Sequence, residues 1–410
     1  MEKDSIKKNS DVILSYAFLS VIIVPIVIYI FSILFDYLGI STLIISILYN
    51  LGFLFLMLLL LKYSSSTAKI LIIVSFIILF FMLVFTKLIF YANGDYIKSN
   101  MEYMLRFAYP YFCVAICIKD FNILFSIIKS ASRILGVLSI LIGILAVTGI
   151  AAESGYSYMS VGYQMLIGTI FISFTALESG RKVDIILALV NLILIFIGGT
   201  RGALICIIVF LILYLLINIK RQSVKLISLI FLGINILILT YLTMIINLNK
   251  IVLMLTHFGL DSKIITKLLN GDFADDSYRG IIYSNMLKSI TNSPLFGHGL
   301  FGDRVENKSL LIFNDRELYA HNIFLEILVQ FGIIVGSLIC LILLVLCIKS
   351  LLSRKYYVQN IFSILISLSI IKLLFSNSYL VEPYFYMLVG LLVAYELSLL
   401  AKKTNKEILR

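Results

Sequence analysis

Residues 321–348 read HNIFLEILVQFGIIVGSLICLILLVLCI, and this stretch decides the fold class. After His321 at its start, it holds a single acidic or basic side chain, that of Glu326. At about 1.5 Å of rise per residue, a helix over this stretch would be roughly 42 Å long. That length exceeds the roughly 30 Å of a bilayer's hydrocarbon core. The stretch is therefore predicted to cross a membrane.

Comparable apolar runs recur along the whole chain. Its 410 residues are 61% hydrophobic and 13% charged, and the mean hydropathy is +1.08. An average soluble domain has roughly 25% charged residues. We predict an all-α polytopic membrane protein of about twelve transmembrane helices. The other predicted spans are 12–34, 38–61, 69–91, 101–118, 134–150, 163–178, 183–198, 201–219, 225–249, 357–379 and 383–401.

No soluble stretch is long enough for an independent domain, so residues 1–410 are predicted to form a single membrane domain. The N-terminal spans occupy residues 1–160, and residues 120–133 are expected to form an interfacial helix. The polar start of the chain lacks a small-residue cleavage site, which predicts a retained first helix. Residues 250–320 are the one long gap between spans. This gap is predicted to be a large extracytoplasmic loop that contains short helices.

The distribution of basic residues predicts the orientation. With the N-terminus inside, the inner segments hold 20 of the 33 basic residues, and the short outer loops hold only Lys98 and Arg201. Basic residues in short loops favour the cytoplasmic side. Both termini are therefore predicted to be cytoplasmic, and the Ile- and Lys-rich composition without tryptophan favours a bacterial origin. The net charge of +11 then reflects topology and contact with anionic membrane lipid, and gives no support for a nucleic-acid partner.

The first candidate for chemistry joins two spans with almost no loop. It reads Gly198-Gly199-Thr200-Arg201-Gly202-Ala203. Thr200 is a plausible N-cap, and glycines let another group approach the backbone closely. A helix N-terminus with an arginine favours an anion. The alternative interpretation is a tight hairpin whose arginine reaches the membrane interface.

The large loop supplies the second and third candidates. Apolar residues recur after Tyr278 at helical spacing, which predicts an amphipathic helix that ends at Ser293-Pro294, with Arg279 in its first turn. An exposed arginine on a loop helix is the alternative. The following glycines and aromatics, Pro294 to Gly302, predict a tight turn in which His298 has a structural role.

The fourth candidate is the point where the loop returns to the membrane, Ala320 to Glu326. His321 is expected at the start of the span, with Glu326 roughly 7.5 Å deeper along the axis. Ionisable residues at such a boundary are candidates for function. The helix dipole would disfavour a charged imidazole and leave one that can accept a proton. A histidine that merely caps the helix is the alternative. Within the spans, Arg106 with Glu102 predicts a simple ion pair.

Taken in order, these motifs resemble the O-antigen polymerase/ligase superfamily. The likeness covers residues 163–400, with a weaker similarity around Arg106. It implies a GT-C-like membrane fold and a glycosyltransferase that works outside the cytoplasmic membrane on undecaprenyl-pyrophosphate-linked glycan. The motif arginine corresponds to Arg201, the loop arginine to Arg279 and the helix-start histidine to His321. One departure is Gly-Thr-Arg-Gly, where many members have a serine before the Ser or Thr.

The resemblance implies an inverting reaction in which Arg201 and Arg279 bind the pyrophosphate and His321 receives or orients the proton of the attacking hydroxyl. Metal ligands are absent from the sequence pattern, so no metal and no cofactor are predicted. Tyr278 and Tyr319 are expected to stack on sugars. The other predicted substrate-binding residues are Asn322, Glu326 and Arg106.

Three functions are compatible with these motifs. The first is a polymerase of lipid-linked repeat units for O-antigen, capsule or exopolysaccharide. The second is a ligase that transfers glycan to lipid A core, a wall polymer or a protein. The third is a lipid-linked oligosaccharide flippase, which the large loop and the lack of an internal repeat disfavour. A chain-length regulator and a flippase are candidate partners of the polymerase.

Overall fold

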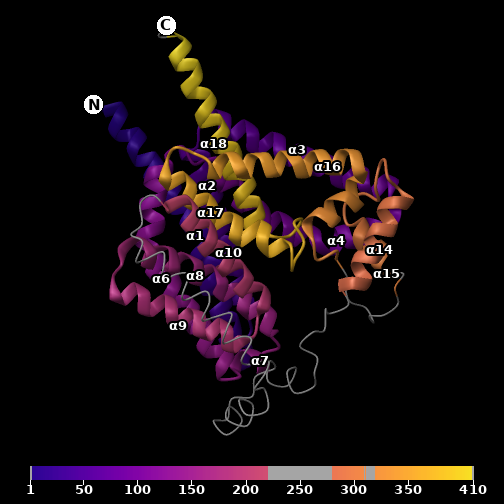
Figure 1. The fold of residues 1–410 in the computed structure, drawn as a ribbon, viewed down its shortest axis with the longest axis horizontal. Coiled ribbons are helices and arrows are strands. Elements are labelled where there is room, and N and C mark those ends of the chain that lie inside the picture. Colours follow the sequence, from indigo (N-terminus) through magenta and orange to yellow (C-terminus); the bar gives the residue numbers. More distant parts are fainter. Residues whose placement is uncertain (1, 220–278, 309, 311–318, 409–410) are drawn as a thin grey trace. The chain divides into compact units, whose positions relative to one another are not determined.

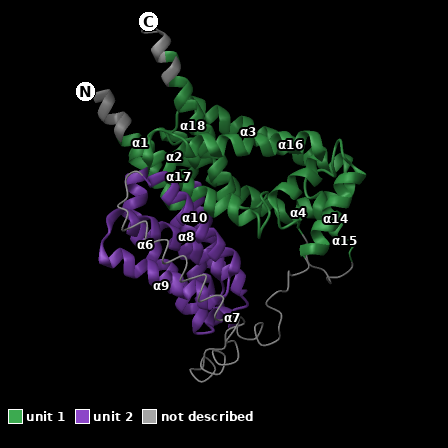
Figure 2. Ribbon diagram, in the orientation of Figure 1, with its two compact units in different colours: residues 1–21, 55–124, 276–410 green, residues 22–54, 125–275 purple. Residues whose placement is uncertain are grey.

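A computed structural model of the protein describes residues 2–219, 279–308, 310 and 319–408 (Figure 1). All regular secondary structure in these ranges is helical. The chain divides into two compact units (Figure 2). Unit 1 comprises residues 1–21, 55–124 and 276–410, and unit 2 comprises residues 22–54 and 125–275. Both units contain long apolar helices. That they form one membrane domain stays a prediction.

Unit 2 is built around a glycine-bearing helix, α8 (Tyr158–Ser179), most of which is buried. A Cβ at Gly168 would collide with the Leu135 carbonyl oxygen, so only glycine permits the observed approach of α6 (Phe121–Val147). The Ser139 hydroxyl donates to the Met165 carbonyl at 2.7 Å. Helices α7 (Ile150–Glu153), α9 (Lys182–Gly198) and α10 (Arg201–Asn218) complete the unit, together with parts of α1 (Glu2–Tyr37) and α2 (Leu43–Tyr63).

Unit 1 packs α18 (Pro383–Ile408) closely against α5 (Tyr109–Ile116), because Gly390 lets the Phe112 carbonyl approach to 2.8 Å of where a Cβ would lie. Its remaining elements are α3 (Ser66–Ile89), η1 (Tyr91–Asn93), α4 (Gly94–Tyr103), the π-helix η2 (Met104–Ala108), α14 (Arg279–Asn292), α15 (Gly302–Lys308), α16 (Ile323–Leu351), α17 (Tyr356–Ile366) and the π-helix η4 (Ser367–Ile371). Helices α14 and α15 lie beside the N-terminal part of α16 (Figure 1).

Eight of the described helices are long and apolar enough to cross a membrane, in agreement with a polytopic membrane protein. Three other predicted spans take a different form in the described residues: 101–118 is divided by a π-helix, α9 has 17 residues and α17 has 11. The predicted span 225–249 lies outside the described residues. The total of about twelve spans and the extracytoplasmic position of the 250–320 loop stay predictions.

The predicted interfacial helix over 120–133 is wrong, because residues 121–147 form one continuous helix. The basic residues that suggested an interface are engaged within unit 2. Arg133 contacts Asp184 at 2.6 Å, and Lys129 lies 3.8 Å from Glu178. Charges paired in this way need not mark the end of a span.

Candidate active site

Helix α14 begins the candidate site. Its inner face carries Ile282, Met286 and Ile290, which are buried against Ala320 and Val329. The described part of the helix runs from Arg279 to Asn292, so the predicted end of the amphipathic helix before Ser293-Pro294 is confirmed. Arg279 is half-buried and lies on a helix whose apolar face is fixed to α16, and its place in the first turn stays a prediction.

The turn after α14 is anchored where α16 breaks. Gly332 has φ +74°, which interrupts the helix and frees carbonyl groups. The backbone N–H groups of His298 and Gly299 donate to the Val329 and Gln330 carbonyls at 2.8 and 3.0 Å. The Ile333 N–H donates to the Pro294 carbonyl at 2.7 Å. The turn therefore satisfies the backbone groups that the break exposes.

His298 holds this turn to the two loop helices. Its Nε2 lies 3.0 Å from the Ser289 carbonyl oxygen, and its Nδ1 lies 3.2 Å from Glu306 Oε1. The Asn93 side-chain amide donates to the carbonyls of His298 and Leu300, each at 2.8 Å. The structural role predicted for His298 agrees with these contacts.

A buried charged cluster lies where α15 meets α16. Arg304 Nη1 is 3.1 Å from Asp303 Oδ1 and 3.5 Å from Glu326 Oε1. Asp303 and Glu326 are completely buried, and Arg304 is 2% exposed. Gln330 donates to Asp303 at 2.9 Å, and the Ala320 N–H donates to the other Asp303 oxygen at 3.1 Å. Charges so deeply buried are tolerated only when they are paired and hydrogen-bonded.

The cluster also holds the segment before α18. The Ser378 hydroxyl donates to Glu326, and the Tyr379 N–H donates to Glu326 Oε2 at 3.3 Å. The Tyr379 hydroxyl donates to Gln330 Oε1 at 2.6 Å. Glu326 was predicted to bind substrate, but each of these contacts joins it to another group of the protein. Its observed position suits a residue that orients the neighbouring segments.

His321 comes just before α16 in the chain, one residue ahead of the helix N-cap. Asn322 is the N-cap, because its side-chain oxygen accepts from the N–H groups of Phe324 and Leu325 at 3.0 and 3.3 Å. His321 therefore does not cap the helix. Its ring packs on Tyr319 with centroids 3.9 Å apart, and its carbonyl accepts from the Tyr283 hydroxyl at 3.4 Å.

The surroundings of His321 keep its imidazole neutral. Burial, followed by the positive charges of Arg279 and Arg304, lowers the pKa of His321 from 6.5 to about 4. Among the residues that the structure describes, the buried Nδ1 atom has no hydrogen-bond partner. Neutral His321 thus lies near two positive charges, and of these two arginines the half-buried Arg279 is the one with surface to meet an anion.

Backbone strain concentrates at the same place. Three non-glycine residues in the described ranges have positive φ: Phe301 (63°), His321 (54°) and Asn377 (67°). The Arg304 guanidinium lies 4.7 Å from the Phe301 ring centroid, and the Asn377 N–H donates to the Tyr319 hydroxyl at 3.0 Å. Such strained conformations cluster at functional sites, where the surrounding structure holds them.

A second ion pair joins residues on either side of Asn377 in the chain. Lys372 lies 2.6 Å from Glu382, and the Asn377 side-chain amide donates to Glu382 at 2.6 Å. Glu382 is completely buried, and its Oε1 has no hydrogen-bond partner among the described residues. The ring contact between His321 and Tyr319 and the two hydrogen bonds of Asn377, to Tyr319 and to Glu382, thus link His321 to Glu382.

The remaining predicted residues lie elsewhere. Arg201 opens α10 in unit 2, after a hairpin in which Gly199 has φ +77°. Thr200 occupies the N-cap position, but its hydroxyl donates to the Tyr158 carbonyl at 3.0 Å instead of capping the helix. The Tyr163 hydroxyl approaches Gly202 closely, as expected for a glycine there.

Arg106 forms the predicted ion pair with Glu102, at 2.7 Å, within unit 1. Tyr278 lies outside the described residues.

Part of the chain matches a known family. Residues 186–340 match the family model described as O-antigen ligase. The match supports the O-antigen polymerase/ligase superfamily, and the resemblance predicted from the sequence motifs is confirmed over this region. No curated protein and no solved structure matches the chain.

The match to this family supports an enzyme of the glycosyltransferase type, with lipid-linked oligosaccharide and membrane lipid as the implied substrates. The matched region includes Arg201, Arg279 and His321, together with the buried cluster of Asp303, Arg304 and Glu326. The polar pair Lys372–Glu382 lies beyond it.

Three acidic or basic residues of the candidate site were not predicted from the sequence: Asp303, Arg304 and Glu382. Asp303 and Arg304 lie in a loop with balanced charge, where no periodic pattern separates a buried ion pair from solvated residues. The described residues contain no group of three His, Cys, Asp or Glu side chains arranged to hold a metal ion.

Proposed function

We propose that the protein polymerises lipid-linked oligosaccharide repeat units on the outer side of the cytoplasmic membrane. The donor is a glycan on undecaprenyl pyrophosphate, and the acceptor is a sugar hydroxyl of another lipid-linked unit. The observation that carries the proposal is the half-buried, neutral His321 near the charges of Arg279 and Arg304, in a region that matches the O-antigen ligase family model.

Arg279 is the residue of unit 1 best placed to bind the pyrophosphate. The sequence predicts Arg279 in the first turn of α14, where helix N–H groups and the macrodipole favour negative charge. A guanidinium also matches phosphate oxygens as a planar fork. Arg201 has the same local setting at the start of α10. We propose that both arginines stabilise the charge that develops on the leaving group.

His321 acts on the attacking hydroxyl. The acceptor oxygen forms a bond to the anomeric carbon, and the bond between that carbon and the pyrophosphate oxygen breaks, with its electrons passing to the leaving group. The hydroxyl proton passes to the imidazole or is oriented by it. Direct displacement inverts the anomeric configuration, and the proposed reaction uses neither metal nor cofactor.

The low pKa of His321 is compatible with a role as proton acceptor only if the bound substrate raises that pKa. At a pKa of about 4 the free imidazole is neutral, but it is a weak base at neutral pH. The negative pyrophosphate would offset the charges of Arg279 and Arg304, which raises the imidazole's affinity for a proton. The site would thus become more basic when the donor is bound.

Arg304 and Glu326 are positioning residues in this proposal. Arg304 pairs with Asp303, which accepts from the Ala320 N–H, and with Glu326 in the first turn of α16, so these buried contacts fix the backbone on either side of His321. Tyr319 supports the imidazole ring directly, and its hydroxyl ties the ring to Asn377. Stacking of Tyr319 or Tyr278 on sugar, and substrate contacts from Asn322, Glu326 and Arg106, remain proposals from the sequence.

A ligase is the second candidate function, because the matching family model is described as O-antigen ligase. It would use the same donor and a different acceptor, such as lipid A core, a wall polymer or a protein. The two functions leave different products when the enzyme is inactive. A glycan gel of a deletion strain, complemented with variants, therefore separates them.

The variants are Arg201→Ala, Arg279→Ala and His321→Ala, each with membrane abundance measured. If the protein is a polymerase, each variant leaves a single repeat unit on the acceptor. If it is a ligase, unattached lipid-linked polymer builds up. Arg181→Ala is the matched control, since Arg181 is an exposed arginine outside the candidate site. Full-length ladders from all three variants would refute the proposed residues.

A further inference from the structure

A cavity of about 1000 Å³ lies within unit 1, away from His321, where the α5–α6 and α16–α17 connections meet α18. Four basic residues line it: Lys119, Lys349, Arg354 and Lys355. They come from two connections and the end of α16, so the fold gathers them from distant parts of the chain. The distribution of basic residues predicts that these connections are cytoplasmic.

The acidic groups near the cavity leave a positive balance. Asp120 is the acidic residue of the lining, and its carboxylate accepts from the N–H groups of Asn122 and Ile123 at 2.8 and 3.1 Å. Lys349 is 2.5 Å from Glu396, so part of its charge is already compensated. The other cationic side chains of the lining are those of Lys119, Arg354 and Lys355.

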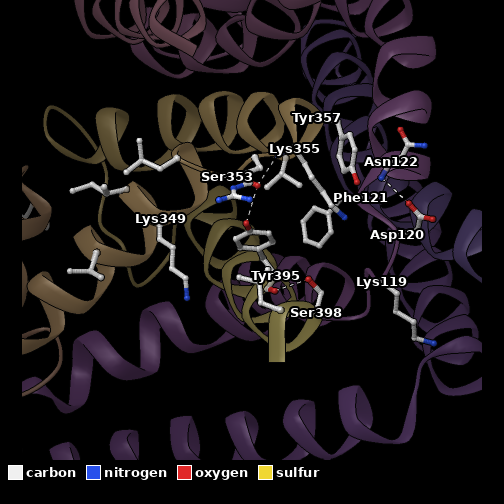
Figure 3. A pocket seen from close by; sticks show the side chains of 16 residues that line it. Lys119, Asp120, Phe121, Asn122, Lys349, Ser353, Lys355, Tyr357, Tyr395 and Ser398 are labelled. Atoms are coloured by element: carbon white, nitrogen blue, oxygen red, sulfur yellow. Dashed lines mark hydrogen bonds between the residues drawn. The ribbon is translucent and has the colours of Figure 1, made fainter. Parts of the chain in front are cut away.

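The interior of the cavity is aromatic. The Phe121 and Tyr395 rings lie 5.8 Å apart in an edge-to-face arrangement, and the Tyr395 hydroxyl donates to Ser353 at 2.9 Å. Figure 3 shows these two rings in the middle of the cavity, with Lys349 on one side and Lys119 on the other. Lys355 lies 5.6 Å from the centre of the Tyr357 ring. These packed rings make a preformed recess with a basic rim.

One wall of the cavity is apolar and open. Val345, Ile348 and Leu352 follow one another at helical spacing towards the end of α16, and 52%, 47% and 75% of their surfaces are exposed. In a membrane, such a helix face meets acyl chains. The cavity thus combines an apolar wall with a cationic rim, which is the complement of a lipid with a phosphate headgroup.

We infer that this cavity binds an anionic phospholipid of the cytoplasmic leaflet, with Lys119, Arg354 and Lys355 around the headgroup phosphate and the α16 wall along its acyl chains. A free phosphate ion would match the cationic rim but would leave the apolar wall unused. The inference is independent of the proposed polymerase activity, since it uses none of the candidate active-site residues.

The chain contains no tryptophan, which provides a clean reporter. The full-length Leu352→Trp protein is placed in phosphatidylcholine vesicles with a minor fraction of brominated phosphatidylglycerol, and its fluorescence quenching is measured. Brominated phosphatidylcholine at the same fraction is the comparison. Leu61→Trp is the position control, because Leu61 is an exposed residue at the predicted cytoplasmic end of α2 and does not line the cavity.

We expect brominated phosphatidylglycerol to quench Leu352→Trp at least about threefold more than brominated phosphatidylcholine, with no such excess at Leu61→Trp. The triple change Lys119→Gln, Arg354→Gln and Lys355→Gln should abolish the excess. The matched triple Lys62→Gln, Arg181→Gln and Lys182→Gln removes the same number and kinds of charges elsewhere and should keep it. Lys119→Arg with Lys355→Arg should also keep it.

Three results would overturn the inference. Equal quenching by the two brominated lipids would show no preference for an anionic headgroup. An equal loss in both triple variants would assign the effect to bulk charge. Relief of the quenching by added inorganic phosphate would show that the site takes a free phosphate and not a lipid.

Discussion

Arg304 and Glu326 form a completely enclosed ion pair, with 3.5 Å between Nη1 and Oε1 and no more than 2% of either side chain exposed. Asp303 shares the same guanidinium at 3.1 Å. Two buried carboxylates therefore depend on one cation. This cluster fixes the chain on both sides of His321, and it makes the site sensitive to the loss of that cation.

Replacement of Arg304 by leucine should destabilise unit 1 strongly. The change leaves Asp303 and Glu326 buried without their cation, which typically costs about 3–5 kcal/mol. Thermal unfolding of the detergent-solubilised protein should show a large fall in melting temperature. Arg279→Leu, at a half-buried position, is the control and should shift it little. Equal melting of Arg304→Leu and wild type would contradict the buried cluster.

His321 should make the protein less stable in acid. Its pKa is about 4 in the folded protein, against an ordinary value near 6.5. Between these values the unfolded chain binds the proton more strongly, so folding stability falls as the pH decreases from about 6.5 to about 4. The measurement is the melting temperature at pH 7 and pH 5, compared between wild type and His321→Gln. The wild type should lose more stability than the variant, and equal losses would contradict the assigned environment.

Gly332→Ala should destabilise the junction between α16 and the preceding turn. Gly332 has φ +74°, and an added Cβ would lie 2.5 Å from the Leu295 carbonyl oxygen. Strain of this kind costs roughly 1–3 kcal/mol. Gly52→Ala is the matched control, since Gly52 lies within α2 and a Cβ there meets no atom within 4 Å. The measurement is the melting temperature of each variant. An equal fall for Gly52→Ala and Gly332→Ala would contradict the break in α16.

The predicted orientation has its own test. A topology reporter fused after Leu310 should be active on the outer side, and one fused after Ser353 should be active in the cytoplasm. Ser353 belongs to the basic connection between α16 and α17, which lines the cavity inferred to bind phospholipid. If both fusions reported the same side, the assignment of α16 as a complete crossing would be wrong.

Periodicity and motif order were sufficient to predict much of the site. The apolar spacing after Tyr278 predicted α14, and the sequence around His321 predicted the start of α16 within two residues. The break at Gly332 was not predicted, because the run is apolar on both sides and the partners that satisfy its backbone come from residues 294–299.

Long-range pairing accounts for the other differences. Lys129 and Arg133 suggested an interfacial helix, but Glu178 and Asp184 pair with them within unit 2. Arg304 seemed one charge among many in a neutral loop, and only tertiary structure brings Glu326 to it. The positive φ of Phe301 likewise leaves no signal in residue type.

Reconstitution with a chemically defined donor tests the central claim most directly. The purified full-length protein receives an undecaprenyl-pyrophosphate-linked repeat unit, and the release of undecaprenyl pyrophosphate and the growth of polymer are followed together. We predict polymer from the wild type and from Arg181→Ala, and rates lower by at least about 100-fold for Arg279→Ala and His321→Gln. Polymer formation at the wild-type rate by these two variants would contradict the account.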